Sequence, residues 1–331
     1  MIRAMQRVGG YEIMDRLGIG GMAEVLLGRA RGAGGFEKFV AVKRILPHMA
    51  ANEEFVRMFI DEARISATLS HSNIAQIFEF GHDAGSFYIA MELVQGMDLR
   101  AMHLALHARR RLPPPAASAY LIQQVCGGLG HAHGKHDSHG RPLGIIHRDV
   151  SPSNVLVSFE GEVKLIDFGV AKAAHRLSVT VGAQLKGKYA YMSPEQAAGK
   201  PIDHRSDLFG AGTLLFELLT GLNPFLAESD LGTLQRVREA RVCAASARAR
   251  DVPPALDEIC RRALARDRDE RFATAAEMQE ALESFTRRVP FSGRHMARWM
   301  KESFPDEQAH LQRMVFEAKQ RSSVQLEVSS K

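Results

Sequence analysis

The order of strand-like and helix-like segments limits the fold of this chain more than any other feature. Up to Leu93 the sequence contains short apolar or β-branched runs bounded by Gly or Asp, which are typical of strands. After Gly96 apolar residues recur at helical spacing. Strands followed by helices predict an α+β fold with two unlike lobes. The expected strands are 11–18, 23–29, 38–45, 76–80 and 87–93, and the expected helices are 99–107, 116–133, 206–220, 231–240, 255–266 and 274–285.

One helix is expected inside the strand-rich part of the chain. Between Asn52 and Ser70 apolar residues recur at helical spacing, and Glu62 lies on the same stripe. A carboxylate on a buried stripe needs a cationic partner. The alternative is that Glu62 is an ordinary carboxylate on the helix surface.

The last segment of the chain differs from the helical part before it. Pro290, Gly293 and Pro305 accompany two expected short helices, and the segment finishes in a polar stretch. We interpret it as an appendage or linker, whose apolar residues could dock on the larger lobe or on a partner, or could remain solvated. The expected division is a small lobe at 11–94, a large lobe at 95–286 and the appendage at 287–331.

Composition argues against several functional classes. The 331 residues carry a net charge of +5 with thinly spread bases and no aromatic interleaving. The densest runs are 109–111 and the arginines between Arg236 and Arg271, which we interpret as solvated faces. We therefore expect no nucleic-acid partner, although a basic nucleic-acid patch is the alternative. The three cysteines lack any zinc or disulfide spacing, which favours a reducing, cytoplasmic location. No membrane segment is expected, because the most apolar window, 208–219, is interrupted by Glu217.

Two features of the strand-rich part indicate a phosphate site. The glycines of residues 18–25 lie between two expected strands, where they let backbone amides approach a polyphosphate. Strand alternation places Ala41 and Lys43 on the face opposite Val40 and Val42. The ammonium of Lys43 could there pair with Glu62 and with phosphate oxygens. The alternatives are an ordinary glycine-rich turn and a solvated lysine on an edge strand.

Two motifs later in the chain identify a family. Residues 147–154 read HRDVSPSN and residues 164–169 read KLIDFG. With these motifs the chain resembles the bacterial eukaryotic-like (Hanks-type) serine/threonine protein kinases over residues 11–285. The resemblance implies a bilobal protein kinase fold, with a β-rich small lobe and a mostly helical large lobe. It also implies transfer of the γ-phosphate of ATP to Ser or Thr hydroxyls of protein substrates.

The resemblance assigns chemical roles to the matching residues. It implies that Asp149 orients the substrate hydroxyl and accepts its proton. Asn154 and Asp167 would hold Mg²⁺ through oxygen ligands. Lys43, paired with Glu62, would bind the α- and β-phosphates of ATP.

The resemblance also implies a slot for the adenine base. Met91 would lie behind the slot as the gatekeeper. The carbonyl of Glu92 and the amide of Val94 would bind the edge of the base, so the identity of these side chains would matter little. Each apolar residue of the slot could instead be ordinary core. The residues expected at the nucleotide are Leu17, Gly18, Ile19, Gly20, Gly21, Val25, Ala41, Lys43, Met91, Glu92, Val94 and Leu156.

Three further matches favour protein substrates. Glu195 follows Ser-Pro where the family has Ala-Pro-Glu, and Arg271 corresponds to the arginine that pairs with that glutamate. Asp207 corresponds to the aspartate that braces the catalytic loop. Kinases of small molecules share the ATP-binding half but generally lack these three residues, so they are the less favoured alternative.

The chain departs from the family pattern beside the catalytic aspartate. Most such kinases have lysine where this chain has Ser151, and threonine where it has Lys188. In the family these two side chains meet near the aspartate. Our hypothesis is that Lys188 supplies, from the activation segment, the positive charge missing at Ser151. The alternative is that Lys188 is exposed and serine is simply tolerated.

Regulation by phosphorylation is also expected. Arg148 and Lys172 together would form a phosphate pocket. Thr180, with Ser178 as second choice, would carry the phosphate that orders the activation segment.

Two alternative functions remain open at this point. A pseudokinase scaffold would bind nucleotide without catalysis, and only Ser151 supports it. Metal binding by a histidine cluster is the other, but irregular spacing favours a solvated insertion. The histidines of this cluster are His131, His133, His136 and His139.

Overall fold

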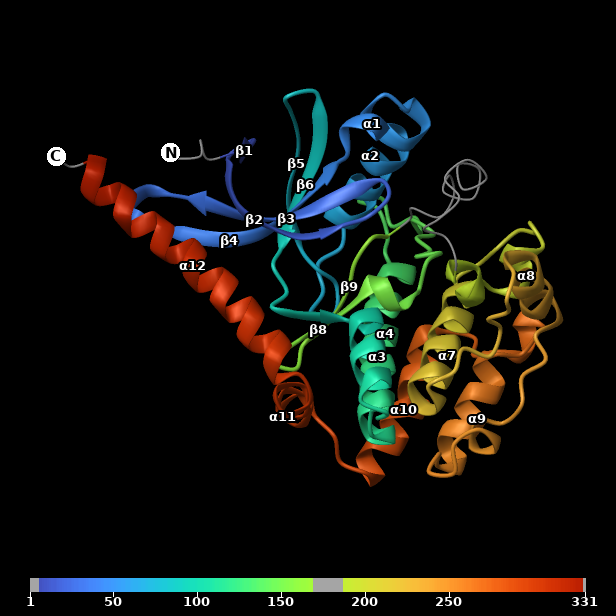
Figure 1. Cartoon of the computed structure of the whole chain (residues 1–331). Helices are drawn as coiled ribbons and strands as arrows, with labels where there is room; N and C mark the ends of the chain where they lie inside the picture. The colour runs from blue at the N-terminus through green and yellow to red at the C-terminus, as the bar shows by residue number, and fades with distance from the viewer. Residues whose placement is uncertain (1–5, 169–186, 330–331) are drawn as a thin grey trace.

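A six-stranded antiparallel sheet forms the smaller of two lobes, at the top of Figure 1. The computed structural model describes residues 6–168 and 187–329, with side chains described up to residue 320. The strand order is β1-β2-β3-β4-β6-β5. Each expected strand is confirmed, with ends that differ by a few residues. The elements are β1 (Arg7–Val8), β2 (Tyr11–Ile19), β3 (Ala23–Arg31), β4 (Glu37–Ile45), α1 (Pro47–Ala50), α2 (Glu53–Ala67), β5 (Ile77–Asp83) and β6 (Ser86–Glu92).

Helix α2 covers one face of this sheet. Its N-terminus is capped by Asn52, whose side chain accepts a hydrogen bond from the amide of Phe55. Met58 and Phe59 pack with apolar residues of β4 and β6 in one buried cluster. Glu62 lies on the same buried stripe and is 5% exposed. The alternative of a surface carboxylate is therefore wrong.

The two faces of the sheet have different neighbours. Val40 and Val42 pack with Tyr88 on one face. Ala41 and Lys43 point to the other face, the one covered by α2, as strand alternation predicts. Because β4 lies between β3 and β6, Lys43 is on an interior strand, and the alternative of an edge-strand lysine is wrong.

The larger lobe is built around the central helices α4 and α7, with a small β7-β8-β9 sheet at its junction with the smaller lobe (Figure 1). The expected helices are confirmed. Helix α4 contacts both α7 and α10. The elements are β7 (Gly96–Asp98), α3 (Leu99–Ala108), α4 (Pro115–His133), β8 (Val155–Ser158), β9 (Val163–Leu165), α6 (Pro194–Ala197), α7 (Arg205–Thr220), α8 (Asp230–Glu239), α9 (Pro254–Ala263), α10 (Ala275–Arg288), α11 (Gly293–Ser303) and α12 (Pro305–Ser329).

The C-terminal segment differs from its expectation. Helix α11 buries Trp299 and Met300 in the core of the larger lobe. The first of the two expected short helices is present as α11. The second is wrong, because α12 is one helix of 25 residues that includes most of the expected polar tail. No Gly or Pro follows Pro305, and nothing local therefore ends the helix early. The alternative of a solvated linker is also wrong, because Val315 and Ala318 are buried.

Two observations bear on the environment of the chain. Within residues 6–168 and 187–329, no helix combines the length and the apolar character needed to cross a membrane. The thiols of Cys126, Cys243 and Cys260 are free, and the first and last of them are buried.

Candidate active site

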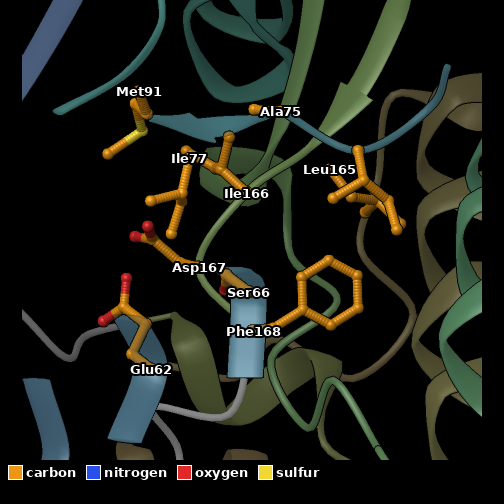
Figure 2. A pocket seen from close by; sticks show the side chains of 10 residues that line it. Glu62, Ser66, Ala75, Ile77, Met91, Leu165, Ile166, Asp167 and Phe168 are labelled. Atoms are coloured by element: carbon orange, nitrogen blue, oxygen red, sulfur yellow. The ribbon is translucent and has the colours of Figure 1, made fainter. Parts of the chain in front are cut away.

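Three charged side chains meet where β4, α2 and the end of β9 come together. The ammonium of Lys43 lies 2.7 Å from Glu62 Oε1 and 2.8 Å from Asp167 Oδ1. Figure 2 shows the carboxylates of Glu62 and Asp167 pointing toward one another. Lys43 and Glu62 are 12% and 5% exposed, and Asp167 is 25% exposed. The structure thus joins three residues that lie far apart in the sequence.

The protonation of this cluster follows from its unequal charges. Burial opposes the charge on Lys43, but the attraction of Asp167 and Glu62 outweighs burial and raises the pKa of Lys43. Burial also opposes ionisation of Asp167, and the attraction of Lys43 overcomes it and lowers the pKa of Asp167. At Glu62 burial prevails over the attraction of Lys43 and raises the pKa to about 8. Two carboxylates thus compete for one ammonium, and Lys43 stabilises the charged form of Asp167 more than that of Glu62.

Asp167 is held in place by the backbone on both sides of it. The amide of Leu165 donates to Asn73 O at 2.8 Å, and Phe168 is buried with its ring 4.5 Å from that of His147. The φ angle of Asp167 is 63°, a left-handed conformation that costs energy for a residue with a side chain. The chain therefore makes a fixed turn that directs the Asp167 carboxylate toward Lys43.

Asp207 holds the predicted catalytic loop, which begins at His147, in place through hydrogen bonds. Its carboxylate accepts hydrogen bonds from the amides of His147 and Arg148, both at 2.8 Å, and Arg148 has a φ of 69°. His133 Nε2 lies 2.7 Å from the same carboxylate. The amide side chain of Gln196 donates to Arg148 O at 2.9 Å. The predicted bracing contact of Asp207 is present, whereas His133 and Gln196 were not predicted, since no motif marks them.

Asn154 joins Asp149, the predicted catalytic aspartate, to the segment that carries Asp167. Its side-chain Nδ2 donates to the main-chain oxygen of Asp149 at 2.8 Å, and its main-chain carbonyl accepts from the amide of Ile166 at 3.1 Å. Because the amide nitrogen is used in this way, the side-chain oxygen Oδ1 is left as the donor atom for a cation. Asn154 and Asp167 thus offer two hard oxygen donors on neighbouring backbone.

This donor set fits a small divalent cation that takes its remaining ligands from phosphate. Such ions favour oxygen ligands and commonly use only one or two protein side chains plus substrate phosphates. No group of three His, Cys, Asp or Glu residues within the described ranges could hold a metal ion without such help. The two side chains suit a nucleotide-bound cation.

Lys188 lies beside the predicted catalytic aspartate. Its ammonium is 2.8 Å from Asp149 Oδ2, and it begins the short 3-10 helix Lys188–Tyr191 after Gly187, whose φ is 103°. Ser151 is buried, two residues after Asp149. Burial would raise the pKa of Asp149, but the attraction and hydrogen bond of Lys188 outweigh it, so the pKa lies below its usual value. Asp149 is therefore ionised at neutral pH.

The structure brings most of the predicted adenine slot together. Ala41 and Met91 belong to one apolar cluster, with Leu17 and Val25 packed against it. Leu156 lies on β8 and is not among the residues of this cluster, so its predicted role stays a prediction.

The glycine-rich turn and the hinge, residues 92–94 between the two lobes, complete this region. Residues Gly18 and Ile19 end β2, and the amide of Gly20 donates to Ala23 O at 2.8 Å, which closes the hairpin. At the hinge, Glu92 Oε1 lies 2.8 Å from the ammonium of Lys164 on β9. This side chain ties the hinge to the strand before Asp167, while the expectation that its identity matters little for binding the base stays a prediction.

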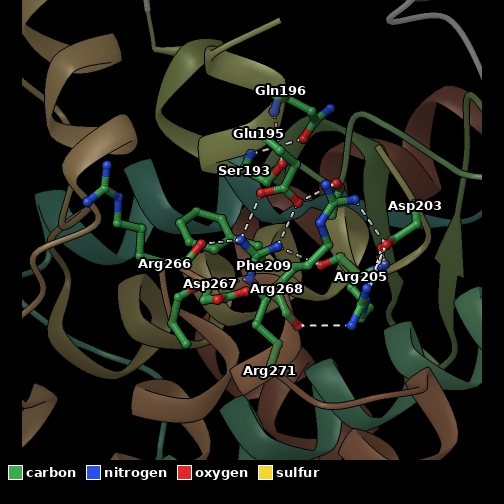
Figure 3. A network of polar contacts seen from close by, with 12 residues as sticks. Ser193, Glu195, Gln196, Asp203, Arg205, Phe209, Arg266, Asp267, Arg268 and Arg271 are labelled. Atoms are coloured by element: carbon green, nitrogen blue, oxygen red, sulfur yellow. Dashed lines mark hydrogen bonds and ion pairs between the residues drawn. The ribbon is translucent and has the colours of Figure 1, made fainter. Parts of the chain in front are cut away.

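Glu195 and Arg271 form a closed ion pair in the larger lobe (Figure 3). The guanidinium binds the carboxylate through two hydrogen bonds of 2.7 and 2.8 Å, and both side chains are buried. Ser206 Oγ donates to the same carboxylate at 2.7 Å. Burial opposes ionisation of Glu195, but the bonds from Arg271 outweigh it and lower the pKa to about 2. The predicted pairing of Glu195 with Arg271 is present.

The predicted phosphate pocket is only partly described. Arg148 Nε is buried and has no hydrogen-bond partner within the described part of the chain. Lys172, Ser178 and Thr180 lie outside the described residues, so their predicted roles stay predictions.

The histidine cluster does not converge on one point. His131 stacks on His71 with ring centres 5.1 Å apart, while His133 contacts Asp207. His136 Nδ1 contacts Gly134 O. His131 and His133 belong to α4, so the description of the whole cluster as a loop insertion is wrong.

Comparisons with known proteins agree with this geometry. The family described as "Protein kinase domain" matches residues 11–284. The crystal structure of the kinase domain of PknI from Mycobacterium tuberculosis superposes with a TM-score of 0.65 and 28% identity, covering 86% of this chain and 98% of that one. The chain therefore belongs to the protein kinase family, and its fold is the protein kinase fold.

The similar curated proteins are bacterial kinases of the Hanks type, which confirms the resemblance inferred from the motifs. The chain is 42% identical over 286 residues to tyrosine-protein kinase MasK of Myxococcus xanthus. It is 38% identical over 279 residues to serine/threonine-protein kinase PknB of Mycolicibacterium smegmatis, and 33% identical over 274 residues to serine/threonine-protein kinase PrkC of Bacillus subtilis. These matches cover 86, 82 and 82% of this chain but 44, 42 and 40% of the relatives. The chain thus spans less than half the length of these relatives.

Proposed function

We propose that this chain transfers the γ-phosphate of ATP to serine and threonine hydroxyls of protein substrates. The observation that carries the proposal is the convergence of Lys43, Glu62 and Asp167 at one point, with Asp149 joined to the same site through Asn154. Phosphoryl transfer needs positioning and neutralised phosphate oxygens more than covalent chemistry by the protein, and this arrangement offers both.

The reaction assigns one task to Asp149. The hydroxyl oxygen of the substrate forms a bond to the γ-phosphorus, while the bond from that phosphorus to the oxygen bridging the β- and γ-phosphates breaks. The electron pair of the broken bond leaves with ADP. The hydroxyl proton passes to the Asp149 carboxylate, which is ionised and available because its pKa is lowered.

Lys43, Asn154 and Asp167 place the nucleotide. Lys43 binds the α- and β-phosphate oxygens, and Glu62 fixes the direction of its ammonium. Asn154 and Asp167 hold Mg²⁺, which when bound neutralises charge on the phosphate oxygens. The apolar residues Leu17 and Val25 cover the base.

Lys188 supplies the cation beside Asp149 that Ser151 cannot supply. Its side chain is 45% exposed, and its ammonium lies within hydrogen-bonding distance of the Asp149 carboxylate, where incoming phosphate would also be attracted. Because it belongs to the segment after Gly187, its position depends on the order of that segment. Phosphorylation of Thr180 or Ser178, with Arg148 and Lys172 as the phosphate pocket, is the switch we propose for that order.

A reciprocal exchange tests the role of Lys188. Lys188→Ala should lower kcat by about ten- to a thousandfold with nearly unchanged nucleotide binding, as for loss of one electrostatic contact in the transition state. Adding Ser151→Lys to Lys188→Thr should restore much of the rate, because the cation then returns from the catalytic loop. Lys200→Ala, an exposed lysine of the same lobe, is the matched control. Wild-type turnover in Lys188→Ala would refute this role.

The class of hydroxyl rests on the relatives. PknB and PrkC are named serine/threonine kinases, whereas MasK is named a tyrosine kinase. We favour Ser and Thr because PknB, PknL and PrkC, from several bacteria, are all named serine/threonine kinases, and their matches cover 74 to 82% of this chain. A cytoplasmic location, where ATP is available and free thiols persist, is part of the same proposal.

Transfer of labelled phosphate tests the function itself. Wild-type protein with [γ-³²P]ATP, Mg²⁺ and a generic protein substrate should label serine and threonine, and Asp149→Asn should abolish the label while it still binds ADP. Label on tyrosine alone would contradict the proposed serine and threonine specificity and indicate a tyrosine kinase. Nucleotide binding without any transfer in the wild type would instead support the pseudokinase scaffold.

A further inference from the structure

Helix α12 contacts both lobes with one face. Phe304, just before the first residue of α12, is fully buried in the core of the larger lobe. Leu311, on the helix itself, packs against the same core. One turn later Val315, followed by Ala318, packs in a cluster with residues of β2 and β3 in the smaller lobe. Residues 311, 315 and 318 share one helix face, since their spacing is four and three. Figure 1 shows α12 running from α11 to the underside of β2, β3 and β4.

Polar contacts hold the helix at both ends of this crossing. On the larger lobe, Arg109 Nη2 lies 3.0 Å from Glu307 Oε1, and the other terminal nitrogen of Arg109 donates to the carbonyl of Ser303. On the smaller lobe, the fully buried Arg29 donates to Ala318 O at 3.5 Å and pairs with Glu12 at 2.6 Å. Arg109 therefore has structural partners, although the sequence indicated a solvated face for residues 109–111.

The helix packs on the same sheet face that forms the nucleotide slot. In the β3–β4 register Val25 is paired with Lys43 and Leu27 with Ala41, so these four side chains point to one face. Val25 packs at the slot, while Leu27, two residues further along β3, is fully buried in the α12 cluster. The slot and the helix are thus neighbours on one strand, roughly 7 Å apart along it.

Two residues belong to both clusters. Leu17, at the roof of the predicted slot, and Leu93, between the hinge residues Glu92 and Val94, pack against the slot cluster and against the α12 cluster. A shift of α12 would therefore disturb the roof and the hinge together. The helix leaves little freedom for the lobes to separate, because one rigid element is bound to each of them.

We propose that α12 is a tether that holds the two lobes in the arrangement that binds nucleotide, with Val315 and Ala318 as positioning residues for ATP. This inference rests on the proposed function for the identity of the ligand. Release of the helix lowers the fraction of molecules with a closed slot, and apparent affinity falls in proportion to that fraction. Saturating ATP restores the closed arrangement, so kcat is largely kept while KM for ATP rises.

Paired leucine variants on β3 test the tether against general destabilisation. Leu27→Ala removes a contact of α12, whereas Leu26→Ala removes an equally buried leucine that packs on the opposite face. The dissociation constant of ADP, measured by calorimetry, should rise about tenfold for Leu27→Ala if the closed fraction falls to about a tenth, and stay near wild type for Leu26→Ala. KM for ATP should follow the same order with kcat nearly constant.

A second pair of variants lies on the helix itself. Val315→Asp places a charge in the apolar contact, while Phe316→Asp changes the next residue, which is 60% exposed. Val315→Asp should raise the ADP dissociation constant and accelerate hydrogen exchange along α12. Val315→Ile keeps an apolar side chain in the contact and should leave both quantities near wild type. Phe316→Asp should leave both near wild type. If Val315→Asp does not fold, Val315→Ala gives the same comparison with a milder change.

Two results would overturn the tether. One is equal loss of ADP affinity in Leu26→Ala and Leu27→Ala, which indicates a merely structural role. The other is faster exchange of α12 amides in Leu27→Ala or Val315→Asp with an unchanged ADP dissociation constant. ADP binding is measured without turnover, so an enzyme that binds ADP but transfers no phosphate would contradict the proposed function and leave this test intact.

Discussion

Two ion pairs of this molecule, Glu195 with Arg271 and Glu62 with Lys43, differ in how fully their charges are compensated. Arg271 binds one carboxylate with two hydrogen bonds and gives others to the carbonyls of Ala265, Arg205 and Arg266. Lys43 instead faces two carboxylates at 2.7 and 2.8 Å. The first pair is neutral and closed. In the second cluster one ammonium serves two carboxylates, and the less well paired one, Glu62, has a pKa raised to about 8 and keeps its proton at pH 7.

This difference separates a structural pair from a binding site. A closed pair in the interior stabilises the fold mainly because removing one partner leaves the other charged and buried. A cluster with two carboxyl groups and one ammonium keeps oxygen atoms available as ligands when a cation arrives, which suits the binding of Mg²⁺ with ATP. Substitutions in the two regions should therefore affect different quantities.

The largest effect is expected from Arg271→Ala. It leaves Glu195 ionised and buried, so the free energy of unfolding should fall by about 3–5 kcal/mol. Chemical denaturation at pH 7 measures this. Arg205→Ala is the matched control, since its partners Asp203 and Asp269 are solvent-accessible and its loss should cost about 1 kcal/mol or less. If Arg271→Ala lowers the free energy of unfolding no more than Arg205→Ala does, the Glu195–Arg271 pair is not the structural pair described here.

Lys43→Met should act on activity instead. Loss of the ammonium removes the contact to the phosphates, and kcat/KM should fall by about a hundred- to a thousandfold. Its free energy of unfolding should change less than that of Arg271→Ala, because Glu62 can bind a proton in place of the lysine. Lys38→Met, on the same strand with an exposed side chain, should retain activity. Steady-state kinetics and denaturation of both variants check this.

The pH dependence of stability should identify Glu195 as a paired carboxylate. Its pKa is lowered from 4.5 to about 2 in the folded chain, so its contribution is complete above about pH 4.5 and is lost as the pH falls through about 2. The stability difference between wild type and Glu195→Gln should therefore shrink between these values. Denaturation curves at pH 7, 4 and 3 measure it, and a difference that is constant with pH would argue against the pair.

The smallest expected change is a displacement of a pH profile. Lys188 holds the pKa of Asp149 below its usual value, and Asp149 must be ionised to accept a proton. Lys188→Ala should therefore move the acidic limb of the kcat/KM profile toward higher pH, while Lys188→Arg should keep it near the wild-type position. A shift in the opposite direction would contradict the contact.

The sequence predicted the residues that carry the chemistry of the site better than the residues that hold them in place. Asp149 and Asp167 lie in motifs whose spacing is tied to phosphoryl transfer, and Glu62 was found because a charge stood on an apolar stripe. His133 could not be found in this way, because its partner Asp207 is 74 residues away and no local pattern relates them. The position of α12 was missed for a similar reason, since an apolar helix face does not reveal which surface it covers.

The dependence of nucleotide affinity on Mg²⁺ tests the contrast between the two regions most directly. Calorimetric titration with ADP, with and without Mg²⁺, should show clearly tighter binding with the ion in the wild type, because the cation offsets the negative charges of Asp167 and of the ADP phosphates. Asp167→Asn should lose most of this gain, and Arg205→Ala should keep it. Equal affinity with and without Mg²⁺ in the wild type would contradict the account.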